Sequence, residues 1–203
     1  MRLRPLLVAL FAIALVWSAI RPHDYFTWLL EVFPALIGIA LLVATRHRFP
    51  LTPLLYVLLF LHALILIVGG HYTYAEVPLG FWMRDAFGLA RNDYDRIGHL
   101  AQGFVPAIAA REVLIRLRVV RGRGWLFTIV VAICLAISAA YELLEWSVSI
   151  ATGSAGDAFL GTQGDIWDTQ KDMTLALIGA IVAQVTLARL HDAQIQGTSI
   201  PTP

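Results

Sequence analysis

Residues 51–70 form an apolar run, LTPLLYVLLFLHALILIVGG, that contains no charged side chain. An α-helix of about 20 apolar residues is long enough to cross the roughly 30 Å hydrocarbon core of a bilayer. Within lipid the backbone must satisfy its own hydrogen bonds, which a helix does internally. The run therefore predicts a transmembrane helix.

Five further apolar segments have the length, or nearly the length, of a membrane span. The chain is therefore predicted to be an all-α, polytopic membrane protein, a bundle of about six transmembrane helices. The composition agrees, because only 14% of the residues are charged, whereas a soluble domain has roughly 25%. Residues 1–192 are predicted to form one transmembrane domain and residues 193–203 a flexible tail. The predicted spans lie near residues 5–20, 27–45, 51–70, 97–117, 125–147 and 172–190.

The first span also has features of a secretory signal, because Arg2 and Arg4 precede a short apolar run. Trp17-Ser18-Ala19 is a poor cleavage site, however, and a second span follows closely. An uncleaved first helix is the favoured interpretation.

Polar residues interrupt the span near 97–117. Pro106 is expected to kink the helix, and Arg111 and Glu112 lie within the apolar stretch. This adjacent pair is expected to form ion pairs or hydrogen bonds between helices rather than to carry chemistry.

Basic residues are distributed unequally between the two ends of the predicted spans, and this bias sets the orientation. With a cytoplasmic N-terminus, nine arginines lie on the inner side and five basic residues lie on the outer side. Both termini are therefore predicted to be cytoplasmic. The inner group is Arg2, Arg4, Arg46, Arg48, Arg116, Arg118, Arg121, Arg123 and Arg189, and the outer group is Arg21, Arg84, Arg91, Arg96 and Lys171.

Net charge and cysteine content limit the possible functions. A formal net charge of +1 indicates no nucleic-acid partner. The single cysteine, Cys134, cannot form an intrachain disulfide and lies in an apolar run, so it is interpreted as a small buried side chain.

The two long outer loops have different expected roles. Within residues 71–96, the section PLGFWMRDAFGL is predicted to lie in the membrane interface as a short amphipathic helix, with Phe81, Trp82 and Phe87 toward lipid. Residues 151–171 are rich in glycine and polar residues and are predicted to fold over the outer ends of the helices.

Most acidic residues gather at the predicted outer face. Asp165, Asp168 and Asp172 are spaced by three and four, so one helix would place them on one side. An alternative for Asp165 and Asp168 is helix capping, which the positive end of the helix dipole favours. Glu142 and Glu145 also share a helical face, at a depth where ionisable groups are costly and usually mark a site.

These residues predict an outward-facing pocket floored by the last three spans. Carboxylates together with imidazole suit a divalent cation such as Mg²⁺, Mn²⁺, Ca²⁺ or Zn²⁺, and Asp95 is placed to orient His99. Glu142 and Asp168 are the predicted catalytic residues. The predicted metal ligands are His71, Asp95, His99, Asp165 and Asp172, and the predicted substrate contacts are Gln102, Tyr141, Glu145, Trp146 and Gln163.

Four segments of the chain resemble the YjdF-like family of bacterial inner-membrane proteins: HYTYAEVP, NDYDRIGHLAQGFVPAIAARE, YELLEW and FLGTQGDIWDTQKDM. The resemblance covers nearly the whole chain and implies a multi-pass protein of the bacterial cytoplasmic membrane. GDIWDTQKDMTLALIGA, following a helix that carries glutamates, is more faintly similar to VanZ-like proteins, which are linked with glycopeptide resistance. Those proteins usually have Asn before the final Gly-Ala, near which this chain has Ala176 and Leu177.

Three functions are compatible with these features. The leading hypothesis is metal-assisted hydrolysis of a lipid-linked or amphiphilic substrate. The second is non-catalytic binding of a lipid or lipophilic compound for envelope maintenance or resistance, with membrane lipids as partners. Transport of a proton or cation is the third, and six short helices without an inverted repeat argue against it.

Overall fold

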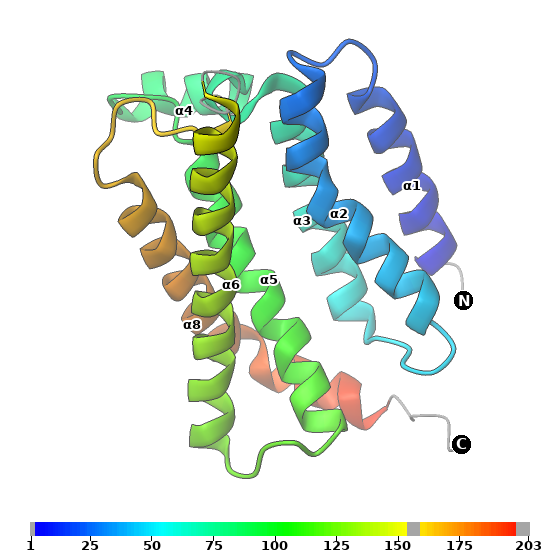
Figure 1. Ribbon diagram of the computed structural model, residues 1–203. Coiled ribbons are helices and arrows are strands. Elements are labelled where there is room, and N and C mark those ends of the chain that lie inside the picture. The colour runs from blue at the N-terminus through cyan, green and yellow to red at the C-terminus, as the bar shows by residue number, and fades with distance from the viewer. Residues whose placement is uncertain (1–2, 154–158, 198–203) are drawn as a thin grey trace.

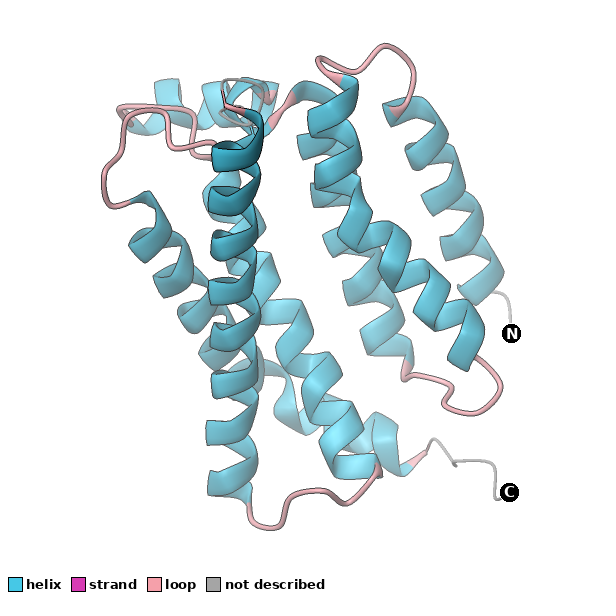
Figure 2. Ribbon diagram, in the orientation of Figure 1, coloured by secondary structure: helices cyan, strands magenta, loops and turns pink. Residues whose placement is uncertain are grey.

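The computed structural model describes residues 3–153 and 159–197. Seven α-helices lie wholly within these residues, together with one short 3₁₀ helix and no strand (Figures 1 and 2). Each predicted span overlaps one helix, which confirms the all-helical fold. The elements are α1 (Leu3–Ser18), α2 (Tyr25–Thr45), α3 (Pro53–Tyr72), η1 (Tyr74–Glu76), α4 (Pro78–Phe87), α5 (Tyr94–Arg116), α6 (Arg123–Thr152) and α8 (Asp168–Gln196).

Four of these helices, α2, α3, α6 and α8, are long and apolar enough to cross a membrane. Their length and composition agree with the predicted multi-pass membrane fold. α1 has only 16 residues, and α5 carries charged residues near both ends, so the number six stays a prediction, as does the cytoplasmic position of the termini.

The helices form two groups. α1, α2 and α3 pack together, as do α5, α6 and α8, and contacts between α3 and α5 join the groups. Figure 1 shows α4 across one end of the bundle, with α1 beginning and α8 ending away from it. Short connections join α1 to α2, α2 to α3 and α5 to α6, which favours antiparallel packing of these neighbours.

α4 corresponds to the predicted interfacial helix. Trp82 and Phe87 expose 62% and 69% of their surface, as expected for side chains that face lipid. Phe81 is partly covered, because the Arg84 guanidinium lies 5.0 Å from the centre of its ring.

Small residues bring α5 and α8 into close contact. A Cβ atom at Gly103 would collide with the backbone of Ala176, and one at Gly179 would collide with the backbone of Leu100. Such contacts let membrane helices gain packing energy without a hydrophobic driving force. The crossing also positions His99 on α5 relative to Asp172 on α8, since each lies one turn from a contact residue.

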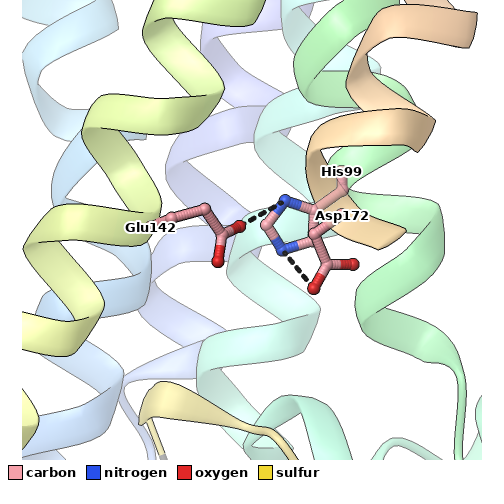
Figure 3. Close-up of side chains that lie close together, drawn as sticks. All are labelled: His99, Glu142 and Asp172. Carbon is pink, nitrogen blue, oxygen red and sulfur yellow. Dashed lines mark ion pairs between the residues drawn. The ribbon is translucent and has the colours of Figure 1, made fainter. Parts of the chain in front are cut away.

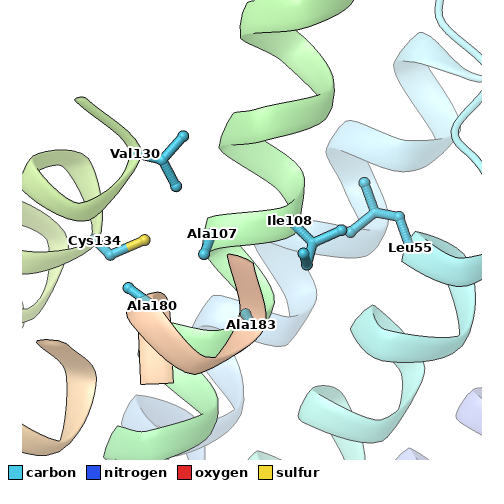
Figure 4. Packing of buried hydrophobic residues seen from close by; sticks show 7 residues of the cluster. All are labelled: Leu55, Ala107, Ile108, Val130, Cys134, Ala180 and Ala183. Carbon is cyan, nitrogen blue, oxygen red and sulfur yellow. The ribbon is translucent and has the colours of Figure 1, made fainter. Parts of the chain in front are cut away.

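A hydrophobic core fills the space between α3, α5, α6 and α8 (Figure 4). Cys134 lies in this core and is fully buried, which confirms its interpretation as a small buried side chain. The other core members are Leu55, Ala107, Ile108, Val130, Ala180 and Ala183.

The predicted tail begins later than expected. α8 continues through Gln196, so residues 193–196 are helical rather than part of a flexible tail. The apolar periodicity weakens after residue 190, but helix hydrogen bonding continues past it. Residues 198–203 lie outside the described residues.

Candidate functional site

A cavity of about 210 Å³ lies between the two helix groups, near the end at which α5 and α8 begin. It extends from Asp168, the first residue of α8, to His62, halfway along α3. The predicted pocket under the loops therefore has walls from α5, α6 and α8, as expected, and further walls from α2, α3 and η1. Seven predicted site residues line it: Asp95, His99, Gln102, Tyr141, Glu145, Asp168 and Asp172.

His99 lies between two carboxylates that come from other helices (Figure 3). Its Nδ1 is 3.6 Å from Glu142 Oε1 on α6, and its Nε2 is 3.8 Å from Asp172 Oδ2 on α8. All three side chains are buried. Both separations exceed the 2.7–3.2 Å of a good hydrogen bond, so the three groups converge without bonding directly.

The remaining hydrogen bonds of this centre are few. Gln102 Oε1 lies 3.3 Å from His99 Nδ1 and belongs to the next turn of α5. Glu142 Oε1 is buried and has no hydrogen-bond partner among the described residues. A buried carboxylate oxygen without a donor or cation is unfavourable, and a bound cation would satisfy it.

Two groups of side chains have the spacing to hold a metal ion. One comprises His99, Glu142 and Asp172, and the other comprises Asp95, Asp168 and Asp172; in each, the ligand atoms lie within 4.8 Å of one another. One imidazole with two carboxylates is a ligand set that Zn²⁺ and Mn²⁺ accept.

Two arginines neutralise the second group. Arg91 Nη2 lies 2.7 Å from both Asp95 Oδ2 and Asp168 Oδ1. Arg96 contacts Asp168 through Nη2, at 2.7 Å, and Asp172 through Nη1. The crowding of negative charge that the sequence indicates is thus relieved by guanidinium groups, which bind carboxylates in fixed geometry. The His99 group is the better candidate for a cation.

The start of α8 corrects the capping alternative. The N-cap position belongs to Trp167, and Asp168 is the first helical residue. Asp165 instead accepts a hydrogen bond from the backbone N–H of Trp167, 3.0 Å away, in the preceding turn. Both carboxylates also contact Arg96 Nη2, at 3.2 Å for Asp165 and 2.7 Å for Asp168.

Asp165 lies apart from the metal-ligand groups. Its carboxylate pairs with Lys171 and, at 3.2 Å, with Arg96. The hydrogen bond from Lys171, followed by that from the Trp167 backbone, lowers the pKa of Asp165 from its ordinary value. This residue, predicted as a metal ligand, ties the loop before α8 to the bundle.

Three predicted site residues point away from the cavity. His71 Nδ1 lies 3.0 Å from the Ser18 carbonyl oxygen, which joins α3 to α1. Trp146 is 57% exposed on the outer surface of α6. Gln163 donates a hydrogen bond to the Asn92 carbonyl oxygen and so links two loops.

Sequence reasoning assigned no site role to four residues near the cavity. Glu31 and Tyr74 line it and are buried, while Arg91 and Arg96 bind its carboxylates. Glu31 had a usable signal, since it is a single carboxylate inside a predicted span. Arg91 had a local signal in its i,i+4 spacing from Asp95. The contacts of Arg96 with α8 had none, because the partner Asp168 lies more than 70 residues away in the sequence.

A second polar cluster lies toward the opposite end of α5. Arg111 Nη1 binds Asp192 Oδ1 at 2.7 Å, and Glu112 Oε2 lies 3.1 Å from His191 Nε2. Glu112 also accepts hydrogen bonds from the backbone N–H and the hydroxyl of Thr52. The prediction that Arg111 and Glu112 form ion pairs or hydrogen bonds between helices is confirmed.

Comparisons with known proteins agree with the fold. Residues 3–193 match the family described as "Predicted membrane protein (DUF2238)". The chain is 52% identical over 198 residues to the inner membrane protein YjdF of Escherichia coli strain K12, covering 96% of this chain and 95% of that protein. No solved structure matches. The chain therefore belongs to the DUF2238 family and is a multi-pass protein of the bacterial inner membrane.

Proposed function

We propose that this protein is a metal-dependent hydrolase that acts on a lipid-linked or amphiphilic phosphate ester within the membrane. His99, Glu142 and Asp172 would bind one divalent cation beside the cavity. The observation that supports this proposal is their convergence from three helices, with the buried Glu142 Oε1 lacking a partner among the described residues.

The location of the cavity supports an amphiphilic substrate. Its lining includes Glu31 of α2 and His62 of α3, and both helices are long and apolar enough to span the bilayer. Glu31 lies six residues into α2, or about 9 Å along the helix axis. A substrate that reaches these groups must enter the hydrocarbon region, which a lipid does readily.

The chemistry follows from the ligands and the cavity wall. The cation would lower the pKa of a bound water molecule and polarise a phosphoryl oxygen. Glu145, which is buried in the cavity wall, would accept the proton of that water. The hydroxide would attack phosphorus, the bond to the leaving oxygen would break, and Glu145 would return the proton to that oxygen. Asp168, predicted as catalytic, would instead hold Arg91 and Arg96.

Metal binding is the first test. Protein purified in detergent and treated with chelator should bind one Mn²⁺ per chain, measured by titration calorimetry and electron paramagnetic resonance. Glu142→Gln removes the charged ligand and should weaken Mn²⁺ affinity at least tenfold. Glu76→Gln, at an exposed residue of η1, should bind like the wild type. Equal Mn²⁺ binding by both variants, or none by the wild type, contradicts the metal site.

The hydrolytic step needs its own assay. Vesicles of bacterial inner-membrane lipid extract, reconstituted with the protein and Mn²⁺, should release phosphate or phosphorylated headgroups. Glu145→Gln should abolish release while keeping Mn²⁺ affinity, because it removes the base and leaves the ligands. Loss of Mn²⁺ binding in Glu145→Gln would contradict the assignment of this residue as base.

A second candidate is non-catalytic binding of a lipid or lipophilic compound in the same cavity. It is favoured by the pairing of Asp95 and Asp168 with arginines, which leaves a largely charge-balanced rim. This function requires a copurifying lipid in chelator-treated protein and no metal-dependent product.

A further inference from the structure

A second cavity of about 250 Å³ lies between α1, α2 and α3, and no step proposed above uses it. Its wall is apolar over most of its length, with Leu7, Phe11, Leu42 and Leu59 among the residues that form it. It meets the acidic cavity at Pro34, His62 and Leu66, which line both. In a bilayer, an apolar wall of this kind favours binding of a lipid acyl chain.

The length of this cavity corresponds to one leaflet. Along α3 it runs from Tyr56 to Leu66, ten residues or about 15 Å. Along α2 it runs from Pro34 to Arg46, twelve residues or about 18 Å. Half of the roughly 30 Å hydrocarbon core is about 15 Å. One acyl chain therefore fits the cavity lengthwise.

α2 is shaped to leave this space. Pro34 lies inside the helix, where it removes a backbone hydrogen bond and favours a kink, and Figure 1 shows α2 changing direction near its middle. One turn further, a Cβ atom at Gly38 would meet nothing within 4 Å. Gly38 thus opens onto the cavity without supporting any packing contact.

Positive charge marks one end of the cavity. Arg4 and Arg46 line it there, and neither has a carboxylate partner within residues 3–153 and 159–197. The Arg4 guanidinium lies 4.8 Å from the centre of the Tyr56 ring, and Arg46 Nε contacts His47 Nε2 at 2.9 Å. Both guanidinium groups keep donors for a phosphate, which attracts basic side chains at a membrane surface.

We propose that this cavity binds one acyl chain of an anionic phospholipid, whose phosphate is held by Arg4 and Arg46. The lipid belongs to the leaflet at the end where α1 begins, which the distribution of arginines predicts to be cytoplasmic. This site is independent of the metal centre, since none of its residues is a ligand there.

Lipid retention tests the site. Protein reconstituted in nanodiscs with equal amounts of phosphatidylglycerol and phosphatidylcholine is released into mild detergent, and the retained lipid is measured by native mass spectrometry. Wild-type protein should keep one lipid, with phosphatidylglycerol at least fivefold over phosphatidylcholine. Arg4→Gln with Arg46→Gln should reduce that preference to near unity, because the phosphate loses both donors.

A volume variant tests the chain separately from the headgroup. Gly38→Leu places a side chain into the cavity without a backbone collision and should abolish retention of both lipids. Arg48→Gln with Arg121→Gln removes two exposed arginines that do not line the cavity and should retain lipid like the wild type. Circular dichroism confirms helix content for each variant.

Several results overturn the proposal. These are wild-type protein that retains no lipid or prefers phosphatidylcholine, unchanged preference after loss of Arg4 and Arg46, and equal losses in the Arg48 and Arg121 control. Retention by Gly38→Leu would place the acyl chain elsewhere. Because the readout needs no metal and no turnover, failure here is distinguishable from failure of the hydrolase.

Discussion

Arg96 binds three carboxylates of the loop before α8 and its first turn. Its two terminal nitrogens contact Asp165, Asp168 and Asp172, and the side chain is only 15% exposed. A planar guanidinium can serve several acceptors in fixed directions, which a lysine ammonium cannot do. Arg96 therefore sets where Asp172 points relative to His99.

Replacing Arg96 by a neutral residue tests how far the fold depends on its charge. Arg96→Gln leaves Asp168 and Asp172 buried with less compensation, and breaking such a pair costs about 3 kcal/mol or more. We expect a clear fall in the thermal unfolding midpoint in detergent. Arg84→Gln, which breaks an exposed pair with Asp85 and a contact with the Phe81 ring, should change it little. An equal effect of the two substitutions would contradict the central role of Arg96.

At the scale of the helices, the crossing of α5 and α8 positions the site. Gly103 lies one turn after His99, and Ala176 lies one turn after Asp172, and these two small residues touch. A change in helix separation there is transmitted directly to the imidazole and the carboxylate. The second polar cluster, of Arg111 with Asp192 and Glu112 with His191, joins the same pair of helices at the other end.

A single methyl group tests this coupling. Gly103→Ala inserts a Cβ atom into the Ala176 backbone, and overpacking of this kind costs about 1–3 kcal/mol. We expect lower stability in detergent unfolding and weaker Mn²⁺ binding in the same variant. Gly38→Ala is the matched control, because its Cβ meets open space; it should leave both properties intact. Normal Mn²⁺ binding by Gly103→Ala would contradict the claim that the crossing of α5 and α8 positions the metal-binding side chains.

At the scale of the whole molecule, the sequence predicted the helices well because apolar length is a local property. It also placed Glu142, His99 and Asp172 at one end of the bundle, since helical spacing and depth are local, but it grouped His71 and Asp165 with them, which the structure places elsewhere. The side of the helix on which each side chain lies was harder to predict from the sequence. Trp146 is only one residue from Glu145, yet it lies about 100° around α6 and faces outward.

Contacts between residues far apart in the sequence could not be predicted from local sequence patterns. His71 shares the depth of the site but packs against α1, opposite the cavity. Arg91 and Arg96 lie in a segment with ordinary loop composition, and their role depends on where α8 folds back. Local patterns in one sequence do not report such long-range pairings, whereas the depth of a residue along its span can be read from its position.

The orientation in the membrane is the remaining whole-molecule prediction. With Cys134 replaced by alanine, single cysteines at Glu76 and Arg121 report on opposite ends of the bundle. A membrane-impermeant maleimide should label Glu76→Cys in intact spheroplasts and label Arg121→Cys only after permeabilisation, because the arginine-rich loop stays in the cytoplasm. The reverse pattern would invert the predicted topology and place the proposed metal site on the cytoplasmic side.

The ion pairs between α5 and α8 have a consequence for biogenesis. α5 leaves the ribosome well before α8, and Arg111 finds its carboxylate partner, Asp192, only on the later helix. Glu112, in contrast, already has Arg116 one turn away on α5. A charge such as that of Arg111 is costly in lipid without its partner, so we expect α5 to be inserted less stably before α8 follows.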